Sequence, residues 1–168
     1  MNTTTQLLNS LYNSMISYYA GDPGRIQHFI KVHSFARLIA QGENLSDEQL
    51  LILEAAAYVH DIGIKPAELK HGECSGPLQE KYGPPEAEKM LRACGFSETV
   101  IERVSYLVGH HHTYTNIDGL DYQILVEADF LVNLYEGNSD KETIEHTYQQ
   151  IFCTRTGKNI CRTMFGGF

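Results

Sequence analysis

Residues 51–64 read LILEAAAYVHDIGI, and this stretch decides the fold class. Apolar residues fill almost every position before the pair His60-Asp61, without the alternation that marks a half-buried strand. A helix that is apolar on nearly all sides is buried inside a larger assembly of helices. Ser46 is a capping residue for its start, and Gly63 favours its end. The stretch therefore predicts a central helix with a His-Asp pair at its carboxyl end.

Helical periodicity continues on both sides of this stretch, and strand-type alternation is almost absent. The segment 70–85 is rich in Gly and Pro and predicts a loop, with Pro66 helping to end the central helix. The last residues, 153–168, are partly amphipathic and are expected to pack back on the other helices. We predict an all-α bundle of about seven helices, of which the other six cover about 5–19, 23–41, 85–94, 97–111, 122–134 and 141–152.

Composition narrows the class of protein. The 168 residues fit a single domain, and the formal net charge of -8, with no stripe of Lys and Arg, argues against nucleic-acid polymers and anionic membranes. No apolar run reaches the roughly 20 residues of a membrane span, and the amino terminus lacks the features of a signal peptide. The four cysteines show no CxxC spacing, which favours free thiols. We therefore expect a cytoplasmic protein.

Two further polar residues fall on predicted inward faces. Asp129 lies in ILVEADFLVNL (124–134) among apolar residues at helical spacing, whereas Glu127 points elsewhere and is expected to reach water. His28 begins HFIKVHSFARLIA (28–40), in which the inward stripe continues through Val32, Phe35, Ala36 and Ile39.

Each of these residues has an ordinary structural explanation when taken alone. The pair His60-Asp61 is compatible with a solvated helix end, and His28 with a hydrogen bond to a backbone carbonyl. Asp129 could be neutralised by an Arg or cap a neighbouring helix. Together, however, two imidazoles and two carboxylates from three predicted helices require a common partner. That set suits a divalent ion such as Fe, Mn, Zn, Co, Ni or Mg, with coordination positions left for water and substrate.

Three segments carry a family resemblance: HFIKV (28–32), YVHDIGI (58–64) and VEADFLV (126–132). They resemble the signatures of the HD-domain superfamily of metal-dependent phosphohydrolases. In that family a His precedes a basic-aliphatic pair, a His-Asp pair precedes an aliphatic residue and Gly, and a distant Asp follows Ala. The resemblance covers about 25–134 and implies one HD domain over residues 1–168, with the terminal helices packed on that core. It also implies one divalent metal ion, with the ligands His28, His60, Asp61 and Asp129.

The cluster His110-His111-His112 ends the predicted helix 97–111. In two-metal and oxygenase-like members of the superfamily, histidines of this region bind a second metal. Those members carry another His where this sequence has Tyr82 and Gly83, so one metal is the better prediction. A second metal held through His110 or His111 stays open, as do a catalytic or substrate-binding role for either and a solvated helix end.

The resemblance also implies an activity. The family often carries a phosphate-contacting Lys directly after the His-Asp signature, where this sequence has Ile64 followed by Lys65. Lys65 is therefore a candidate substrate-binding residue, although a surface lysine is an equal alternative.

The resemblance as a whole implies a phosphohydrolase acting on a small phosphate ester such as a nucleotide, with Asp61 and His110 or His111 in catalysis. The alternatives are a di-iron oxygenase-like HD enzyme and a non-catalytic HD module that senses a ligand. By analogy with other HD proteins, the tyrosine-rich amino-terminal helix offers a face for a homodimer.

Overall fold

The computed structural model describes residues 3–168, which form nine helices and no strand. The all-α prediction is therefore confirmed, with two more helices than the sequence suggested. In chain order the helices are α1 (Thr3–Tyr18), α2 (Pro23–Gly42), α3 (Asp47–Val59), α4 (Ile64–His71), α5 (Gly76–Cys94), α6 (Glu98–Val108), α7 (Leu120–Glu136), α8 (Lys141–Ile151) and α9 (Arg155–Met164).

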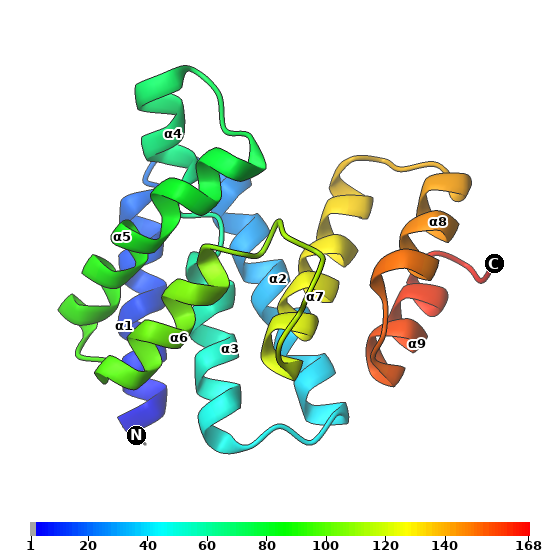
Figure 1. Ribbon diagram of the computed structural model, residues 1–168, viewed down its shortest axis with the longest axis horizontal. Helices are drawn as coiled ribbons and strands as arrows, with labels where there is room; N and C mark the ends of the chain where they lie inside the picture. The colour runs from blue at the N-terminus through cyan, green and yellow to red at the C-terminus, as the bar shows by residue number, and fades with distance from the viewer. Residues whose placement is uncertain (1–2) are drawn as a thin grey trace.

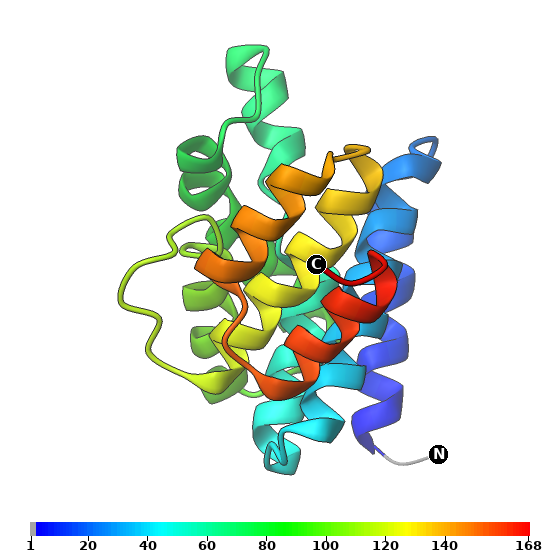
Figure 2. The ribbon, with the colours of Figure 1, turned by 90° about the vertical axis from the view of Figure 1, so that its right-hand side faces the viewer.

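Helix α3 lies at the centre of the bundle and packs against α1, α2, α6 and α7 (Figure 1). Helix α5 covers α6 and α1, and α4 projects from the bundle beside the start of α5. Helices α8 and α9 lie on the outside of α7, and α9 also contacts α2, as the side view shows (Figure 2). None of the helices described is both long and apolar enough to cross a membrane.

The central helix begins where the sequence predicted, but it ends at Val59, before Gly63, and Pro66 lies in α4. Ser46 and Gln49 form a capping box, with the Ser46 hydroxyl accepting from the Gln49 amide and the Gln49 side chain accepting from the Ser46 amide. The stretch from Ile52 to Val59 is buried throughout. The chain then turns at His60 and Asp61, so the His-Asp pair stands at the inner end of a fully packed helix.

The prediction of a loop over 70–85 was wrong. Helix α4 includes Pro66, which is tolerated in a first helical turn, and α5 begins at Gly76 and passes through Pro84 and Pro85. The two prolines remove hydrogen-bond donors inside α5, but packing compensates for that loss. The buried stripe that packs α5 on its neighbours starts before the prolines and comprises Gln79, Gly83, Ala87 and Leu91.

Two glycines explain how closely α5 approaches the turn that carries the His-Asp pair. A Cβ atom on Gly63 would lie 2.4 Å from the Gln79 carbonyl oxygen and 2.8 Å from the Gly83 amide nitrogen. A Cβ atom on Gly83 would lie 2.6 Å from Val108 Cγ1. All three distances are far inside van der Waals contact, so only glycine fits at either position.

The expectation that Glu127 reaches water was also wrong. Its side chain is fully buried, and its Oε1 accepts from the amides of Cys153 and Thr154 at 2.6 and 2.8 Å. The Thr154 hydroxyl donates to Oε2 at 2.5 Å. Glu127 therefore fixes the junction of α8 and α9 against α7, which sequence periodicity alone could not show.

Glu54 is the charged residue inside the apolar run of α3. Its side chain is 4% exposed and accepts from His33 at 3.0 Å and from Arg37 at 2.6 Å. The His33 ring in turn stacks on Tyr58, with the ring centroids 4.1 Å apart. Burial would raise the pKa of Glu54, but His33 and Arg37 outweigh it and lower the pKa below its usual 4.5. The carboxylate is therefore stabilised in the folded state.

We expect Glu54→Gln to destabilise the fold by about 1–3 kcal/mol at pH 7, because hydrogen bonds to a buried charge are lost. Since the folded-state pKa lies below the unfolded value of 4.5, this stabilisation is complete above that pH and disappears as the pH falls through the folded value. Urea denaturation of both proteins between pH 7 and pH 3 measures the difference. Glu102→Gln, on the exposed face of α6, is the control, and a pH-independent difference at Glu54 would contradict the prediction.

Candidate metal centre

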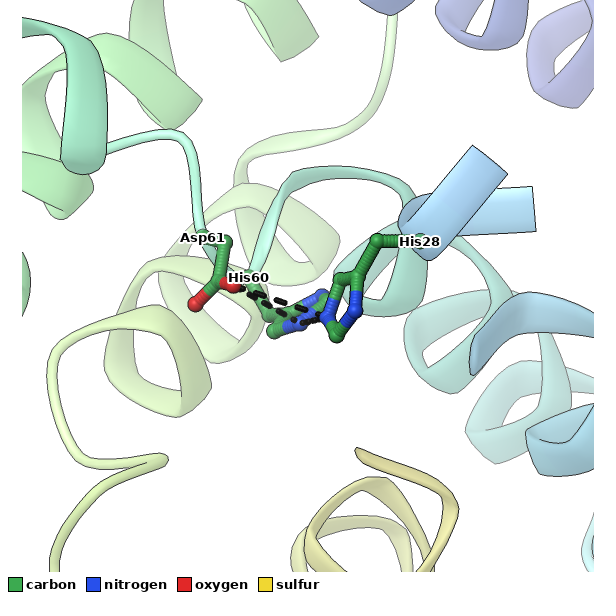
Figure 3. A group of neighbouring side chains, drawn as sticks. All are labelled: His28, His60 and Asp61. Carbon is green, nitrogen blue, oxygen red and sulfur yellow. Dashed lines mark hydrogen bonds and ion pairs between the residues drawn. The ribbon is translucent and has the colours of Figure 1, made fainter. Parts of the chain in front are cut away.

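Four predicted ligands converge from three parts of the bundle. His28 comes from α2, His60 and Asp61 from the turn after α3, and Asp129 from α7. His28 Nε2 lies 3.3 Å from His60 Nε2, 3.5 Å from Asp61 Oδ2 and 3.2 Å from Asp129 Oδ1. Figure 3 shows the side chains of His28, His60 and Asp61 pointing toward one another. The structure thus brings together the residues that the sequence singled out.

The hydrogen bonds of the two histidines determine which nitrogen faces the centre. His60 Nδ1 donates to the Ala57 carbonyl oxygen at 3.0 Å, and His28 Nδ1 donates to Glu136 at 2.9 Å. A carbonyl and a carboxylate only accept, so each neutral ring carries its proton on Nδ1 and a lone pair on Nε2. With both rings neutral, two lone pairs would face each other at 3.3 Å and form no hydrogen bond. A cation bound by both nitrogens resolves this arrangement.

Asp129 supplies an independent test of the fit. Its Oδ1 is buried and has no hydrogen-bond partner within the described part of the chain. It lies 3.2 Å from His28 Nε2 and 3.5 Å from His60 Nε2. An ionised oxygen without a partner is costly in a buried position, and a divalent ion is the partner that two carboxylates and two imidazoles suit. The donor set therefore fits a metal ion.

The same groups stabilise positive charge in the absence of a metal. Burial would lower the pKa of His28, but Asp129, with Asp61 and Glu136, outweighs it and raises the pKa to about 9. Burial would raise the pKa of Asp129, yet His28 and His60 hold it well below its usual range. This preference for positive charge is the property that a cation site needs.

Outside these four residues, Glu136 holds His28 in place. Its Oε2 accepts from His28 Nδ1 at 2.9 Å, and its Oε1 lies 2.7 Å from Lys31 Nζ. Such a carboxylate fixes the tautomer and orientation of a metal-binding histidine. Sequence analysis did not identify Glu136, although it lies seven residues after Asp129 on the same helix and therefore on nearly the same face.

We expect Glu136→Ala to weaken metal binding about tenfold. This is the lower end of the range for residues that hydrogen-bond a metal ligand, because the Glu136 side chain is 33% exposed and water can replace it in part. Glu136→Gln should recover much of this loss, since its amide oxygen still accepts from His28 Nδ1. Competition titration against a chelator measures both affinities. Equal affinities for Glu136→Ala and the unaltered protein would contradict the assigned role.

Asp61 also faces the segment after α6. Its Oδ1 lies 3.0 Å from His111 Nε2 and 3.9 Å from His112 Nε2, and these three residues form a second group of candidate ligands. Gln79 restricts this group. Its amide nitrogen donates to the Cys74 carbonyl at 2.9 Å, so its oxygen accepts from His112 Nε2 at 3.1 Å. In this arrangement His112 Nε2 is a donor and offers no lone pair to a second metal.

Two predicted site residues lie in other surroundings. His110 Nδ1 donates to the Tyr106 carbonyl at 2.7 Å and its ring stacks on Tyr106, with 4.1 Å between centroids. Lys65 Nζ donates to the Tyr18 carbonyl at 2.7 Å, at the carboxyl end of α1. The geometry favours structural roles for both residues, and it places His111 and His112 beside Asp61 instead.

A cavity of about 210 Å³ opens at the candidate metal centre, with His28 and Asp61 in its wall. Phe29 and Ile64 form apolar parts of the wall, and Arg25 contributes a positive charge. This volume is below the roughly 300–1,000 Å³ of sites that enclose a whole drug-sized ligand. The cavity therefore suits a small group next to the metal, with the remainder of a larger ligand outside.

Comparisons with known proteins agree with this geometry. The chain is similar over residues 25–147 to the HD domain family. It also resembles the solved structure described as a predicted HD superfamily hydrolase from an uncultured Thermotogales bacterium, with 24% identity and a TM-score of 0.64 over 96% of this chain and 84% of the other. Curated protein sequences contain no significant match. Because the family match spans most of the chain and includes all four converging residues, the protein belongs to the HD domain family.

Proposed function

We propose that this protein is a metal-dependent phosphohydrolase that acts on a small phosphate ester such as a nucleotide. The observation that carries the proposal is the convergence of two Nε2 atoms, 3.3 Å apart, and a buried, unpartnered Asp129 oxygen beside an open cavity. Membership in the HD domain family supports it, as does the description of the Thermotogales protein as a hydrolase.

The roles of the residues follow from their positions. His28, His60, Asp61 and Asp129 would hold one divalent ion, which when bound neutralises phosphoryl charge and activates water for attack. Asp61 also lines the cavity, where it can orient a water molecule, and His111 positions the Asp61 carboxylate through the 3.0 Å contact. Phe29 and Ile64 exclude bulk water from part of the wall.

A single ion is the stoichiometry that the side-chain contacts support. Because Gln79 accepts from His112 Nε2, and His111 Nε2 already contacts Asp61 Oδ1 at 3.0 Å, the group Asp61, His111 and His112 lacks a full set of free ligand atoms for a second metal. The di-iron oxygenase-like activity requires that second metal. Elemental analysis of anaerobically purified protein distinguishes the two activities, with one equivalent of metal expected here.

A phosphatase screen over nucleotides and sugar phosphates, with each of several divalent metals added, tests the proposed function. We expect metal-dependent release of phosphate from at least one class of ester. His60→Ala and Asp61→Ala should lose both metal and activity while circular dichroism shows an intact helical fold. Unchanged metal content in both variants would refute the assignment of the site, and a complete lack of turnover by the metal-loaded protein would refute the activity.

A further inference from the structure

The cavity beside the metal centre contains a cation that the roles above leave unused. Arg25, in the first turn of α2, lines this cavity together with His28 and Asp61. Its guanidinium carbon lies 5.9 Å from the centre of the Tyr19 ring, and the Tyr19 hydroxyl donates to the Asp61 carbonyl oxygen at 3.1 Å. These contacts connect Arg25 to the turn that carries two of the metal ligands.

The guanidinium of Arg25 is paired with two carboxylates. Glu68, on α4, accepts from both terminal nitrogens at 2.6 and 3.1 Å, and Asp22 Oδ2 lies 3.3 Å from Nη1. A carboxylate held by two parallel N–H groups uses the same donors with which arginine binds a phosphoryl group. The Glu68 carboxylate therefore occupies the place that an anionic ligand would take on Arg25.

Exchange of Glu68 for a ligand disturbs little of the fold. The side chains of Arg25 and Glu68 are 30% and 38% exposed, so water can replace Glu68 in part when its carboxylate leaves the guanidinium. Within α4 the buried residue is Ala67, and the neighbouring Leu69 is 80% exposed. Release of Glu68 thus breaks a partly buried pair on a lightly packed helix and leaves the core intact.

We propose that Arg25 is the anion-binding residue of this cavity and takes the phosphoryl group of the substrate in exchange for Glu68. The inference rests on the proposed function in identifying the anion as phosphate. Among the residues that line the cavity, Arg25 supplies a positive charge, whereas the carboxylate of Glu136 is already paired with Lys31 and His28. The proposal therefore places the phosphoryl group at Arg25, on the α2 side of the cavity.

Calorimetric titration of inorganic phosphate into the metal-loaded protein tests this proposal, with metal content measured for every sample. Arg25→Ala is expected to weaken phosphate binding on the order of tenfold, because a two-point, charge-assisted contact is lost. Arg25→Lys should be intermediate, since lysine keeps the charge without the planar fork. Glu68→Gln should bind phosphate about two- to fivefold more tightly, because the competing charge is removed. Arg92→Ala, which breaks the exposed pair with Glu98, is the matched control and should bind as the unaltered protein does.

Equal phosphate affinity in Arg25→Ala and Arg92→Ala would overturn the proposal, and so would the absence of tighter binding in Glu68→Gln. If Arg25→Ala does not retain its metal, the opposite changes expected for Arg25→Lys and Glu68→Gln decide the question. The outcome is separable from the phosphatase screen. Arg25-dependent phosphate binding without turnover would support the anion site and refute the phosphohydrolase activity. Turnover with an unchanged KM in Arg25→Ala would support the activity and refute the anion site.

Discussion

Replacing Asp129 by asparagine is expected to weaken metal binding by more than about 100-fold, beyond the effect of losing an outer partner of a ligand. The substitution keeps the shape of the side chain but removes its charge, and the buried Oδ1 lies 3.2 Å from His28 Nε2. In this variant Asp61 would be the remaining carboxylate near both His28 Nε2 and His60 Nε2, at 3.5 and 3.6 Å. Elemental analysis and chelator competition measure the loss.

Asp121→Asn is the matched control for this experiment. Asp121 is also a buried aspartate on α7, with 4% of the residue exposed, but it pairs with Arg103 rather than with the histidines. We expect this variant to retain its metal. Circular dichroism should show the same helix content in both variants. A metal content in Asp129→Asn equal to that of the control would exclude Asp129 as a ligand.

The sequence was sufficient to predict the four residues that converge at the centre. Each lies on a helix or helix end whose apolar pattern has a clear period, so the inward face was readable for His28 and Asp129. The pair His60-Asp61 required only the end of the buried run to be located. Periodicity therefore carried the prediction as long as one helix could be treated by itself.

Residues whose role depends on a second segment were not predictable in this way. Gln79 became a partner of His112 only because α5 continues through two prolines, which local propensity argues against. Which of the three successive histidines after α6 faces the candidate site depends on how the chain turns there. His110 stacks on Tyr106, whereas His111 faces Asp61. Long-range packing decided the partners of Gln79 and His111.

Glu127 shows the same limit and leads to the second large expected effect. Helical periodicity placed it away from Asp129, and that much agrees with the structure, since its carboxylate faces the α8–α9 junction instead. A position off the inward stripe was interpreted as solvent-exposed because the sequence does not show that α9 packs there. Helix α9 lies so close to Glu127 that a Cβ atom on Gly157 would lie 1.9 Å from Glu127 Oε2.

We expect Glu127→Ala to destabilise the protein by about 3–4 kcal/mol, because the amides of Cys153 and Thr154 and the Thr154 hydroxyl would lose their buried acceptor. Glu127→Gln should cost only about 1 kcal/mol, since its amide oxygen can still accept from both backbone amides. Urea denaturation of the two variants measures this difference.

The thiol of Cys161 on α9 gives a local readout of the same change. Cys161 is fully buried, and burial, reinforced by the charge of Glu127, raises its pKa to about 11. In Glu127→Ala we expect this thiol to react with a disulfide reagent much faster, because α9 is released from α7 and the negative charge is gone. Metal content should stay unchanged, since Glu127 and Asp129 face different neighbours. Equal stability of the alanine and glutamine variants, with Cys161 still protected, would show that the hydrogen bonds of Glu127 do not hold the carboxyl-terminal helices in place.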